Sequence, residues 1–295
     1  MNIERWMKKH AASLDGKLVA VTGSTGGIGE ELCRHLASLG ADLLLLNRNL
    51  TRSQKQGADL LSKFPNIKID VLTVDLEDFR SVREVTEKLK AIPVDAFIHN
   101  AGAYSIPRKT CDTGFDNVFQ INFVSPYYII RELLPNLQAR NGCAVAVGSI
   151  AHNYSKIDPD DVDFSTYRAA SKIYGNAKRH LTYGLMELFA KQNDARLAIT
   201  HPGITFTNIT AHYPKLIFAL IKHPMKIIFM KPKKAALCVL GGLFEVCSSR
   251  QWIGPRWFDI WGLPKKKALN TASAEERARI AERAEGIYQG LKEQK

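Results

Sequence analysis

The chain has 295 residues, of which 45% are hydrophobic and 24% charged, and it carries a formal net charge of +12 at pH 7. This length suits one large α/β domain, and the composition is ordinary for a soluble globular protein. No stretch reaches the roughly 18 consecutive apolar residues of a membrane span, and residues 1–17 lack the apolar core of a signal peptide. The five cysteines form no CxxC pair, which argues against a zinc site or a disulfide framework. We therefore expect a cytoplasmic protein without a metal site.

The positive charge is concentrated in one segment. Residues 211–234 contain six lysines and no acidic residue, so half of the net charge lies in these 24 residues. A basic protein can bind nucleic acid, but this segment interleaves its lysines with aliphatic residues and the chain has no nucleic-acid-binding motif. We expect no nucleic-acid partner.

Six short apolar runs alternate with longer amphipathic stretches through the first two hundred residues. Each run has strand length and is almost continuously apolar, as in strands covered on both faces. The runs are residues 18–22, 42–47, 69–74, 96–99, 144–148 and 196–201. Strand–helix alternation at this spacing implies right-handed crossovers and a parallel sheet. With no linker or repeat to divide the chain, we predict an α/β fold: a single doubly wound Rossmann domain over residues 1–295, with about seven strands and helices on both faces.

Three helices are expected from amphipathic patterns. Two of them cover residues 29–39 and 78–90. A third is expected over residues 273–293, where Ser273 is an N-cap and a glutamate follows three positions later. We expect the mixed charges of this C-terminal helix to form a solvated face. Ligands of such folds bind outside the carboxyl ends of the strands, so functional motifs should follow strands directly.

A glycine-rich turn follows the first expected strand. The sequence TGSTGGIG at 22–29 lies between a strand and a helix. Glycines let the backbone approach a pyrophosphate closely, and the helix directs its free N–H groups at the anion. The alternative is a tight turn that uses glycine only for its geometry. We predict a dinucleotide site whose contacts are Gly23, Ser24, Thr25, Gly27, Ile28 and Gly29.

The end of the second strand predicts which dinucleotide binds. It carries Asn47, Arg48 and Asn49, with no carboxylate to hold a ribose hydroxyl. A guanidinium suits a phosphate, so NADP(H) is favoured over NAD, unless Arg48 is merely a solvated loop residue. At the end of the third strand, Asp75 is a candidate to bond the adenine amino group, and Leu76 beside it is expected to line the same site.

The motifs TGSTGGIG, HNAG at 99–102 and HPG at 201–203 resemble the short-chain dehydrogenase/reductase family, and the resemblance runs from about residue 14 to residue 262. The family usually has asparagine at the position of His99, and we expect a structural variant there. The resemblance implies that the NAG segment stabilises the sheet beside the cofactor and that residues after the PG pair contact the nicotinamide. The residues concerned are Asn100, Ala101, Gly102, Pro202, Gly203 and Thr207.

Two tyrosines compete for the family's catalytic position. Tyr167 is followed by a lysine after five residues, on a different side of a helix, whereas Tyr174 and Lys178 are spaced i,i+4 and share one face. Tyr174 also lies 28 residues before Pro202, close to the family's usual distance. We therefore predict Tyr174 and Lys178 as the pair. A lysine ammonium about 4–5 Å away should lower the pKa of the tyrosine by roughly two to three units.

The resemblance supplies two further catalytic candidates. Ser149 follows the fifth strand and should donate a hydrogen bond to the substrate oxygen. Asn122 matches the family asparagine that holds a water behind the lysine. The 25 residues between Ser149 and Tyr174, and the sequence WIGPRWFDIWGLP downstream, resemble the branch that contains retinol dehydrogenases.

Residues 208–230, with lysines flanking aliphatic runs, lie where the family places its substrate lid. Three roles remain open: a lid over an apolar substrate, a peripheral contact with an anionic membrane, or packing against another subunit of a homo-oligomer. Each favours a lipophilic substrate.

The expected activity is transfer of a hydride between NADP(H) and an apolar carbonyl or alcohol, with Tyr174 as general acid or base. The main alternative is an NADP(H)-sensing or scaffolding protein, which would normally lack the tyrosine or the lysine. An epimerase or dehydratase of nucleotide sugars would normally need a larger C-terminal domain.

Overall fold

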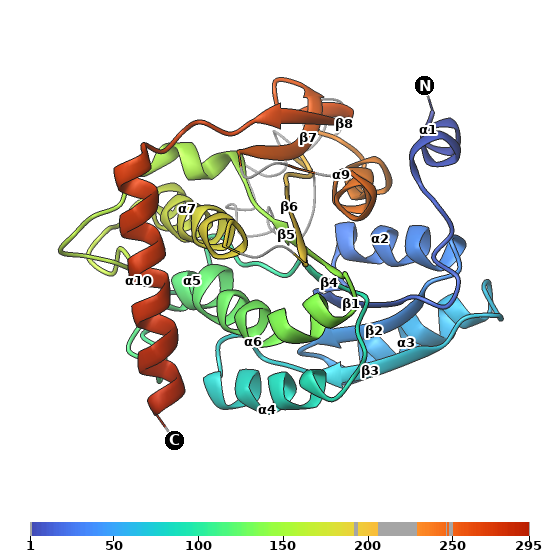
Figure 1. Cartoon of the computed structure of the whole chain (residues 1–295), viewed down its shortest axis with the longest axis horizontal. Coiled ribbons are helices and arrows are strands. Elements are labelled where there is room, and N and C mark those ends of the chain that lie inside the picture. The colour runs from blue at the N-terminus through green and yellow to red at the C-terminus, as the bar shows by residue number, and fades with distance from the viewer. Residues whose placement is uncertain (1, 192–193, 206–228, 246, 248–249, 295) are drawn as a thin grey trace, which may run out of the picture.

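A single eight-stranded sheet organises the chain, in the order β3-β2-β1-β4-β5-β6-β7-β8 (Figure 1). The computed structural model describes residues 2–191, 194–205, 229–245, 247 and 250–294. The six expected strands are present to within one residue at each end, and the strand bounds are β1 (Leu18–Thr22), β2 (Asp42–Asn47), β3 (Ile69–Thr73), β4 (Ala96–His99), β5 (Cys143–Val147), β6 (Arg196–Thr200), β7 (Gln251–Trp257) and β8 (Trp261–Ala268).

The expected parallel sheet of about seven strands is confirmed, and the described residues form seven parallel strands and one antiparallel strand. Strands β1 to β7 pair in parallel, and β8 pairs antiparallel with β7 at the edge of the sheet. The sequence of β8, WGLPKKKA, contains a proline and three lysines. These residues are typical of edge strands, which need not be apolar on both faces, so β8 lacks the pattern by which the buried strands were predicted.

Helices cover both faces of the sheet and enclose a hydrophobic core on each side. One face carries α1 (Ile3–His10), α2 (Gly27–Ser38), α3 (Leu50–Leu61) and α9 (Pro232–Phe244). The other carries α4 (Phe79–Lys90), α5 (Asn117–Phe119), the π-helix η1 (Gln120–Val124), α6 (Ser125–Ala139) and α7 (Ala170–Phe189). The helices expected over 29–39 and 78–90 are confirmed as α2 and α4, with Asp78 as the N-cap of α4.

The C-terminal helix α10 (Ala274–Glu293) is confirmed, and the Ser273 side chain caps it by accepting a hydrogen bond from Glu276 N. The amphipathic pattern is confirmed, although not all of the charges lie on the solvated face. Four of its side chains are buried: Ile280, Ala284, Tyr288 and Leu291. Because these residues recur every three or four positions, they form an apolar stripe that packs onto α7 and α6 (Figure 1). Charged residues beside the stripe pair with α7, as Arg277 does with Glu187 at 2.9 Å.

The N-terminal helix α1 was not expected from the sequence. Its Trp6 side chain is only 2% exposed and packs over Gly241 of α9.

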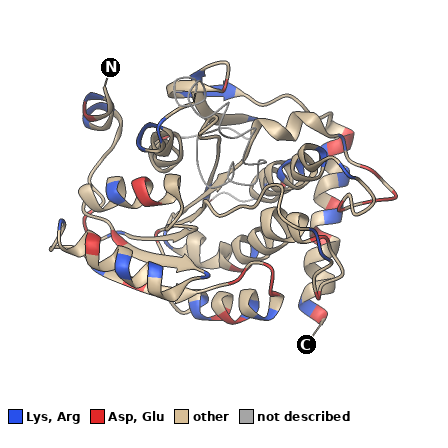
Figure 2. Ribbon diagram, turned by 180° about the vertical axis from the view of Figure 1, so that it is seen from behind, with Lys and Arg blue, Asp and Glu red and all other residues tan. Residues whose placement is uncertain are grey.

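None of the helices within the described residues is long and apolar enough to cross a membrane. Acidic and basic residues interleave along the outer helices (Figure 2). Of the segment expected as a lid, residues 208–228 lie outside the described residues.

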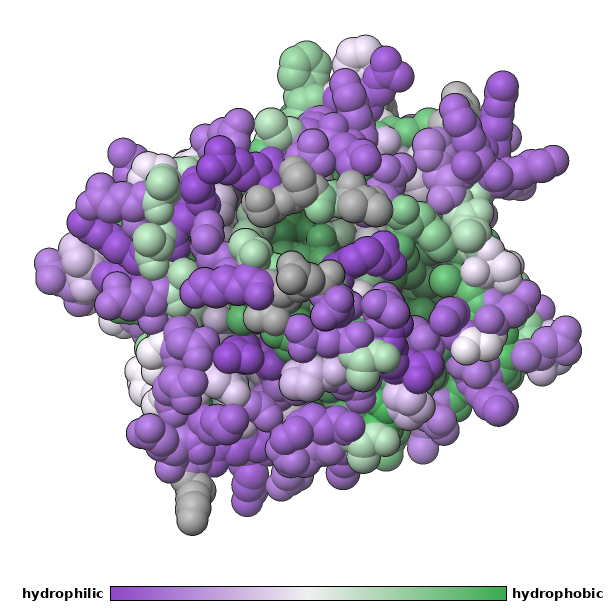
Figure 3. All heavy atoms as spheres, viewed as in Figure 1, coloured by the Kyte–Doolittle hydropathy of each residue, from purple (hydrophilic) through white to green (hydrophobic). Residues whose placement is uncertain are grey.

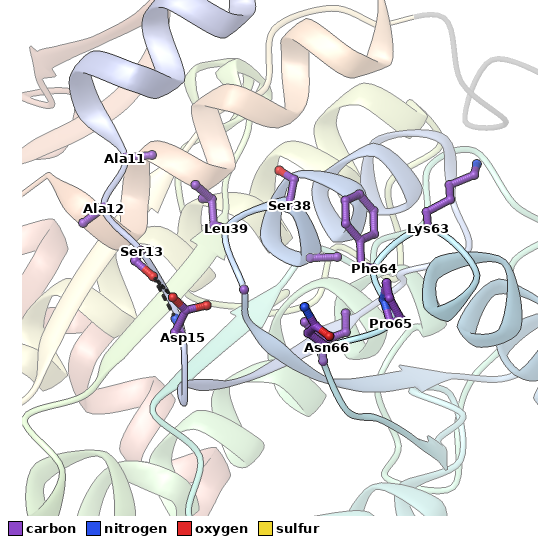
Figure 4. Close-up of a pocket in the computed structure, with 13 residues that line it drawn as sticks. Ala11, Ala12, Ser13, Asp15, Ser38, Leu39, Lys63, Phe64, Pro65 and Asn66 are labelled. Atoms are coloured by element: carbon purple, nitrogen blue, oxygen red, sulfur yellow. Dashed lines mark hydrogen bonds between the residues drawn. The ribbon is translucent and has the colours of Figure 1, made fainter.

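One surface pocket lies away from the edge of the sheet where ligands are expected. It has a volume of ≈ 530 Å³ and is lined by residues that precede β1, β2 and β3, including Asp15, Gly40 and Ile67 (Figure 4). Within it, the Ser13 hydroxyl donates to Asp15 at 2.7 Å. The pocket therefore opens at the amino ends of the strands, opposite to the carboxyl ends at which ligands of such sheets bind.

Candidate active site

The turn between β1 and α2 is too tight for side chains at two of its glycines. Gly23 has φ 66°, and a Cβ there would lie 2.8 Å from Ala101 Cα. A Cβ at Gly29 would lie 2.2 Å from Gly23 O. Gly26, the N-cap of α2, contributes no side-chain hydrogen bond to the first turn, so backbone N–H groups dominate the end of the helix. This arrangement fits the phosphates of a dinucleotide, which bind to such N–H groups.

Buried polar side chains brace this turn from behind. Asn47 Nδ2 donates to Ser24 Oγ at 2.7 Å and to Ser53 Oγ at 2.8 Å. The Ser24 hydroxyl donates to Gln56 Oε1 at 2.7 Å, and Gln56 Nε2 donates back to Ser24 O at 2.9 Å. The side chains of Ser24 and Asn47, predicted as cofactor contacts, are therefore occupied in shaping the loop. The bracing residues Ser53 and Gln56 were missed because nothing in their spacing marks them.

Two guanidinium groups lie beside the glycine turn. The Arg48 side chain is 74% exposed, and its nearest acid is Asp75 at 3.9 Å. Arg52, at the start of α3, donates to Thr25 O of the turn at 3.2 Å. Asn49 caps α3 by accepting from Arg52 N at 2.9 Å. Guanidinium groups suit phosphate binding, and Arg52 was not among the sequence predictions.

The other predicted residues of this region have defined partners. Asp75 accepts a hydrogen bond from Glu77 N at 3.0 Å. The carbonyl oxygen of the buried Leu76 accepts from Ser125 Oγ at 2.7 Å. Asn100 Nδ2 donates to Gly23 O at 3.0 Å, which ties the end of β4 to the glycine turn.

His99 is fully buried beside Thr22. Thr22 Oγ1 accepts from Asn100 N and Ala101 N, both at 3.1 Å, so its own proton points to His99 Nδ1 at 3.1 Å. The neutral ring therefore carries its proton on Nε2. Burial and the nearby Lys178 hold the pKa of His99 well below its usual value, so the ring stays neutral. His99 thus fits the structural variant that we expected.

The residues after β6 approach the turn between β7 and β8. His201 stacks on Trp252 and its Nε2 donates to Asp259 O at 2.9 Å. Gly203 has φ 81°, and a Cβ there would lie 2.5 Å from Ile260 O. The PG pair therefore makes a turn that requires glycine. Thr207 lies outside the described residues.

Three of the four predicted catalytic residues meet where β5 and α7 come together. Ser149 lies close enough to Tyr174 for its hydroxyl to lower the pKa of the tyrosine. Lys178 Nζ lies 5.6 Å from the centroid of the Tyr174 ring and donates to Val147 O at 2.8 Å. The i,i+4 spacing of Tyr174 and Lys178 on α7 places both on the face toward β5.

The competing tyrosine lies apart from this group. The Tyr167 hydroxyl donates to Asp158 at 2.9 Å and its ring stacks on Phe164 at 4.0 Å. Lys172 donates to the carbonyl oxygen of Tyr154. The structure therefore joins Tyr174 with Ser149 and Lys178, whereas Tyr167 contacts no lysine among the residues described.

Asn122 lies in the π-helix η1, behind Lys178. Its Nδ2 donates to Ala103 O and Val118 O, both at 2.8 Å. A Cβ at Gly102 would lie 2.8 Å from Asn122 Oδ1 and 3.6 Å from Lys178 Nζ. Glycine at this position therefore leaves Asn122 and Lys178 near each other, and a π-helical turn is a frequent feature of functional sites.

Burial controls the protonation of the tyrosine–lysine pair. Desolvation raises the pKa of Tyr174 to about 12, with the Ser149 hydrogen bond opposing it, and desolvation lowers the pKa of Lys178 to about 7. The expectation that Lys178 lowers the pKa of Tyr174 was wrong for this geometry. Both groups lose hydration, which disfavours the phenolate and the ammonium alike, and Lys178 is not among the groups that lower the pKa of Tyr174.

The surroundings of Tyr174 on the side away from Lys178 are largely apolar. Tyr104 meets the Tyr174 ring edge-on, with 5.3 Å between centroids. The cluster around them consists of Ile106, Val118, Phe164, Tyr167 and Ile173. Hydrophobic residues also gather in a hollow near the centre of the face seen in Figure 3, whereas hydrophilic side chains cover most of the rest.

Comparison with known proteins places the chain in a family. A family model described as short chain dehydrogenase matches residues 17–215. Human polyprenol dehydrogenase is 27% identical over 207 residues, and human retinol dehydrogenase 13 is 28% identical over 207 residues. These alignments cover 66% and 68% of this chain, and the chain spans only 63% and 62% of the relatives' own lengths.

Solved structures share the fold at low sequence identity. An uncharacterized protein from Mycobacterium paratuberculosis has a TM-score of 0.71 and 21% identity, covering 95% of this chain and 94% of its own. L-sorbose reductase from Gluconobacter frateurii, complexed with NADPH and L-sorbose, has a TM-score of 0.60 and 20% identity, covering 79% of this chain and 94% of its own. The resemblance seen in the motifs is confirmed: the chain belongs to the short-chain dehydrogenase family of oxidoreductases.

Proposed function

We propose that the protein transfers a hydride between NADP(H) and the carbonyl or alcohol carbon of an apolar substrate. The observation that carries this proposal is the meeting of Ser149, Tyr174 and Lys178 at the carboxyl ends of the strands, on the same edge as the glycine turn. A nicotinamide cofactor would supply the hydride.

The side chains at this edge have complementary roles in the proposal. Tyr174 carries a proton at neutral pH, so it can donate that proton to a carbonyl oxygen during reduction. Ser149 Oγ accepts a hydrogen bond from Ala151 N at 3.2 Å, which leaves the hydroxyl proton for the same oxygen. Lys178 lies beside the Tyr174 ring and is held there by its hydrogen bond to Val147 O, with Asn122 packed near its Nζ.

The preference for NADP(H) rests on the charges beside the glycine turn. Arg48 and Arg52 offer two guanidiniums where β2 ends, and Asn47 and Asn49 stand where an NAD-binding protein would place an acid. Asp75 is 35% exposed and 3.9 Å from Arg48, so it is weakly engaged with that cation in the described structure.

The apolar substrate class is supported by the aromatic and aliphatic cluster around Tyr174. The names of two relatives, polyprenol dehydrogenase and retinol dehydrogenase 13, point to lipophilic alcohols as their substrates. The test is NADPH oxidation, followed by nicotinamide absorbance, against matched aldehydes and ketones with long alkyl or hydroxylated chains. We expect higher kcat/KM for the alkyl members. Better turnover of the hydroxylated members would contradict the substrate class, and NADPH binding without turnover of either would favour a sensing protein.

The pKa of Tyr174 predicts different pH profiles for the two directions. Reduction needs the protonated phenol, which persists through neutral pH because burial raises the pKa to about 12. Oxidation needs the phenolate, whose fraction grows about tenfold per pH unit below that pKa. We therefore expect oxidative kcat/KM to rise steadily from pH 6.5 to 9, as measured at saturating cofactor. A plateau of the oxidative rate beginning near pH 7 would contradict this assignment.

A further inference from the structure

A chain of hydrogen bonds connects Ser149 to the segment before α10. We call its members the His152 network: His152 in the 3-10 helix η2 (Ile150–Tyr154), Arg179 and Tyr183 in α7, Thr271, and Glu276 in α10. His152, Arg179 and Tyr183 are each at most 2% exposed. None of them follows from the family motifs named above.

The side-chain hydrogen bonds of the His152 network run in one direction from Tyr183 through Thr271 and His152 to Ser149. His152 Nδ1 lies 2.5 Å from Ser149 O, and a carbonyl oxygen can only accept, so Nδ1 carries the proton. The neutral ring then accepts at Nε2 from Thr271 Oγ1, 2.9 Å away. Thr271 Oγ1 in turn accepts from the Tyr183 hydroxyl at 2.5 Å, and Tyr183 accepts from Thr271 N at 3.2 Å.

At the other end, His152 fixes the turn that orients the Ser149 hydroxyl. Ser149 O accepts from both His152 N, at 3.1 Å, and His152 Nδ1. Ser149 Oγ accepts from Ala151 N within the same turn. The turn therefore fixes the position of the Ser149 hydroxyl, which lies close enough to Tyr174 to lower its pKa.

Arg179 locks the network to the C-terminal helix. Its Nε and Nη2 each donate to a Glu276 carboxylate oxygen at 2.7 Å, in a bidentate pair. Its remaining donors reach His152 O at 2.9 Å and Thr271 O at 2.6 Å. One buried guanidinium therefore holds the backbone of both η2 and the segment before α10, and such bidentate pairs fix geometry as well as adding energy.

We propose that the His152 network is a positioning device for Ser149, through which the segment at Thr271 and Glu276 sets the direction of the catalytic hydroxyl. This inference rests on the proposed function for the role of Ser149. His152, Thr271 and Arg179 act through Ser149 and not on the substrate.

The test compares substitutions that keep or remove single contacts. His152→Asn places an amide N–H near the position of Nδ1, whereas His152→Leu removes it. We expect His152→Leu to lower kcat ~10-fold, with the KM and the NADPH dissociation constant within about twofold of wild type, because a small misalignment of a catalytic group is costly. His152→Asn should recover most of the loss. Thr271→Val should lower kcat ~3-fold, and Thr271→Ser, which keeps the hydroxyl, should have a kcat close to that of the wild type.

A double-mutant cycle decides between positioning and general structural support. In a Ser149→Ala background, Thr271→Val and His152→Leu should lower kcat little further. The effects of substitutions that act through one group are not additive. Thr86→Val is the control, since it removes a buried threonine hydroxyl outside the network, which donates to Val82 O in α4. Thr271→Val removes two hydroxyl hydrogen bonds, those with His152 and with Tyr183. Equal losses in both backgrounds, or no loss with His152→Leu, overturn the proposal. If His152→Leu fails to fold, the Thr271 cycle gives the answer.

A second readout does not depend on turnover. The carbon-13 chemical shift of Tyr174 Cζ reports the surroundings of the Tyr174 hydroxyl, including Ser149, and it should move in Thr271→Val and not in Thr86→Val. An unmoved shift overturns the positioning proposal even if the wild type is inactive. Conversely, an inactive wild type with a moved shift contradicts the proposed function and leaves the network intact.

Discussion

Tyr174→Phe is expected to lower kcat for carbonyl reduction by about a thousandfold, within the range measured for removal of a general acid. The substitution removes only the hydroxyl, so the edge-on contact with Tyr104 and the packing around the ring remain. The NADPH dissociation constant and the free energy of unfolding should change little. Steady-state kinetics, a cofactor titration and a urea melt measure the three quantities.

The matched control is Tyr167→Phe. The Tyr167 hydroxyl donates a hydrogen bond to Asp158, and its ring belongs to the same hydrophobic cluster as the Tyr174 ring. We expect it to retain kcat within a few fold of wild type, because Tyr167 lies apart from Ser149 and Lys178. An active Tyr174→Phe protein together with an inactive Tyr167→Phe protein would contradict the assignment of the catalytic tyrosine.

Removing the two arginines beside the glycine turn is expected to abolish the preference for NADPH. A charge-assisted hydrogen bond contributes about 1.5–3 kcal/mol, so Arg48→Ala should weaken NADPH binding by ~10- to 100-fold. The Arg48→Ala, Arg52→Ala double variant should bind NADPH more weakly still. NADH lacks the phosphate, so its dissociation constant should stay within about twofold. Fluorescence titrations with both nucleotides measure these changes.

Arg279→Ala is the control for the loss of one positive charge. Arg279 lies on α10, with its side chain 58% exposed and paired with Glu275. Arg279→Ala should leave the dissociation constants of NADPH and NADH unchanged. Equal weakening of NADH and NADPH by Arg48→Ala would show a general effect on the loop and would contradict recognition of a phosphate by this side chain.

The parts of the fold that could be predicted are those in which neighbouring residues carry the signal. Buried parallel strands must be apolar along their whole length, so six strands were found to within one residue. The glycine turn and the i,i+4 pair of Tyr174 and Lys178 are also local patterns. The edge strand β8 and the helix α1 carry weaker patterns, because one is polar and the other is anchored mainly by Trp6.

Features that depend on distant contacts could not be predicted. His152 and Thr271 are 119 positions apart, and only the folded chain shows that they meet. The amphipathic pattern of α10 was visible in the sequence, but its two ion pairs with α7, made by Glu276 and Arg277, depend on residues 97 and 90 positions away. The pKa of Tyr174 depends on how far water is excluded from it and from Lys178, which the i,i+4 spacing does not specify.

The most direct test of the central claim is transfer of deuterium from cofactor to product. Wild-type protein is incubated with an alkyl aldehyde and NADPH deuterated at C4 of the nicotinamide, prepared in both stereochemical forms, and the alcohol is analysed by mass spectrometry. We expect one deuterium on the carbinol carbon from one of the two forms, and about a thousandfold slower labelling with Tyr174→Phe. Absence of labelled alcohol with either form, or equally fast labelling by Tyr174→Phe, would contradict the account.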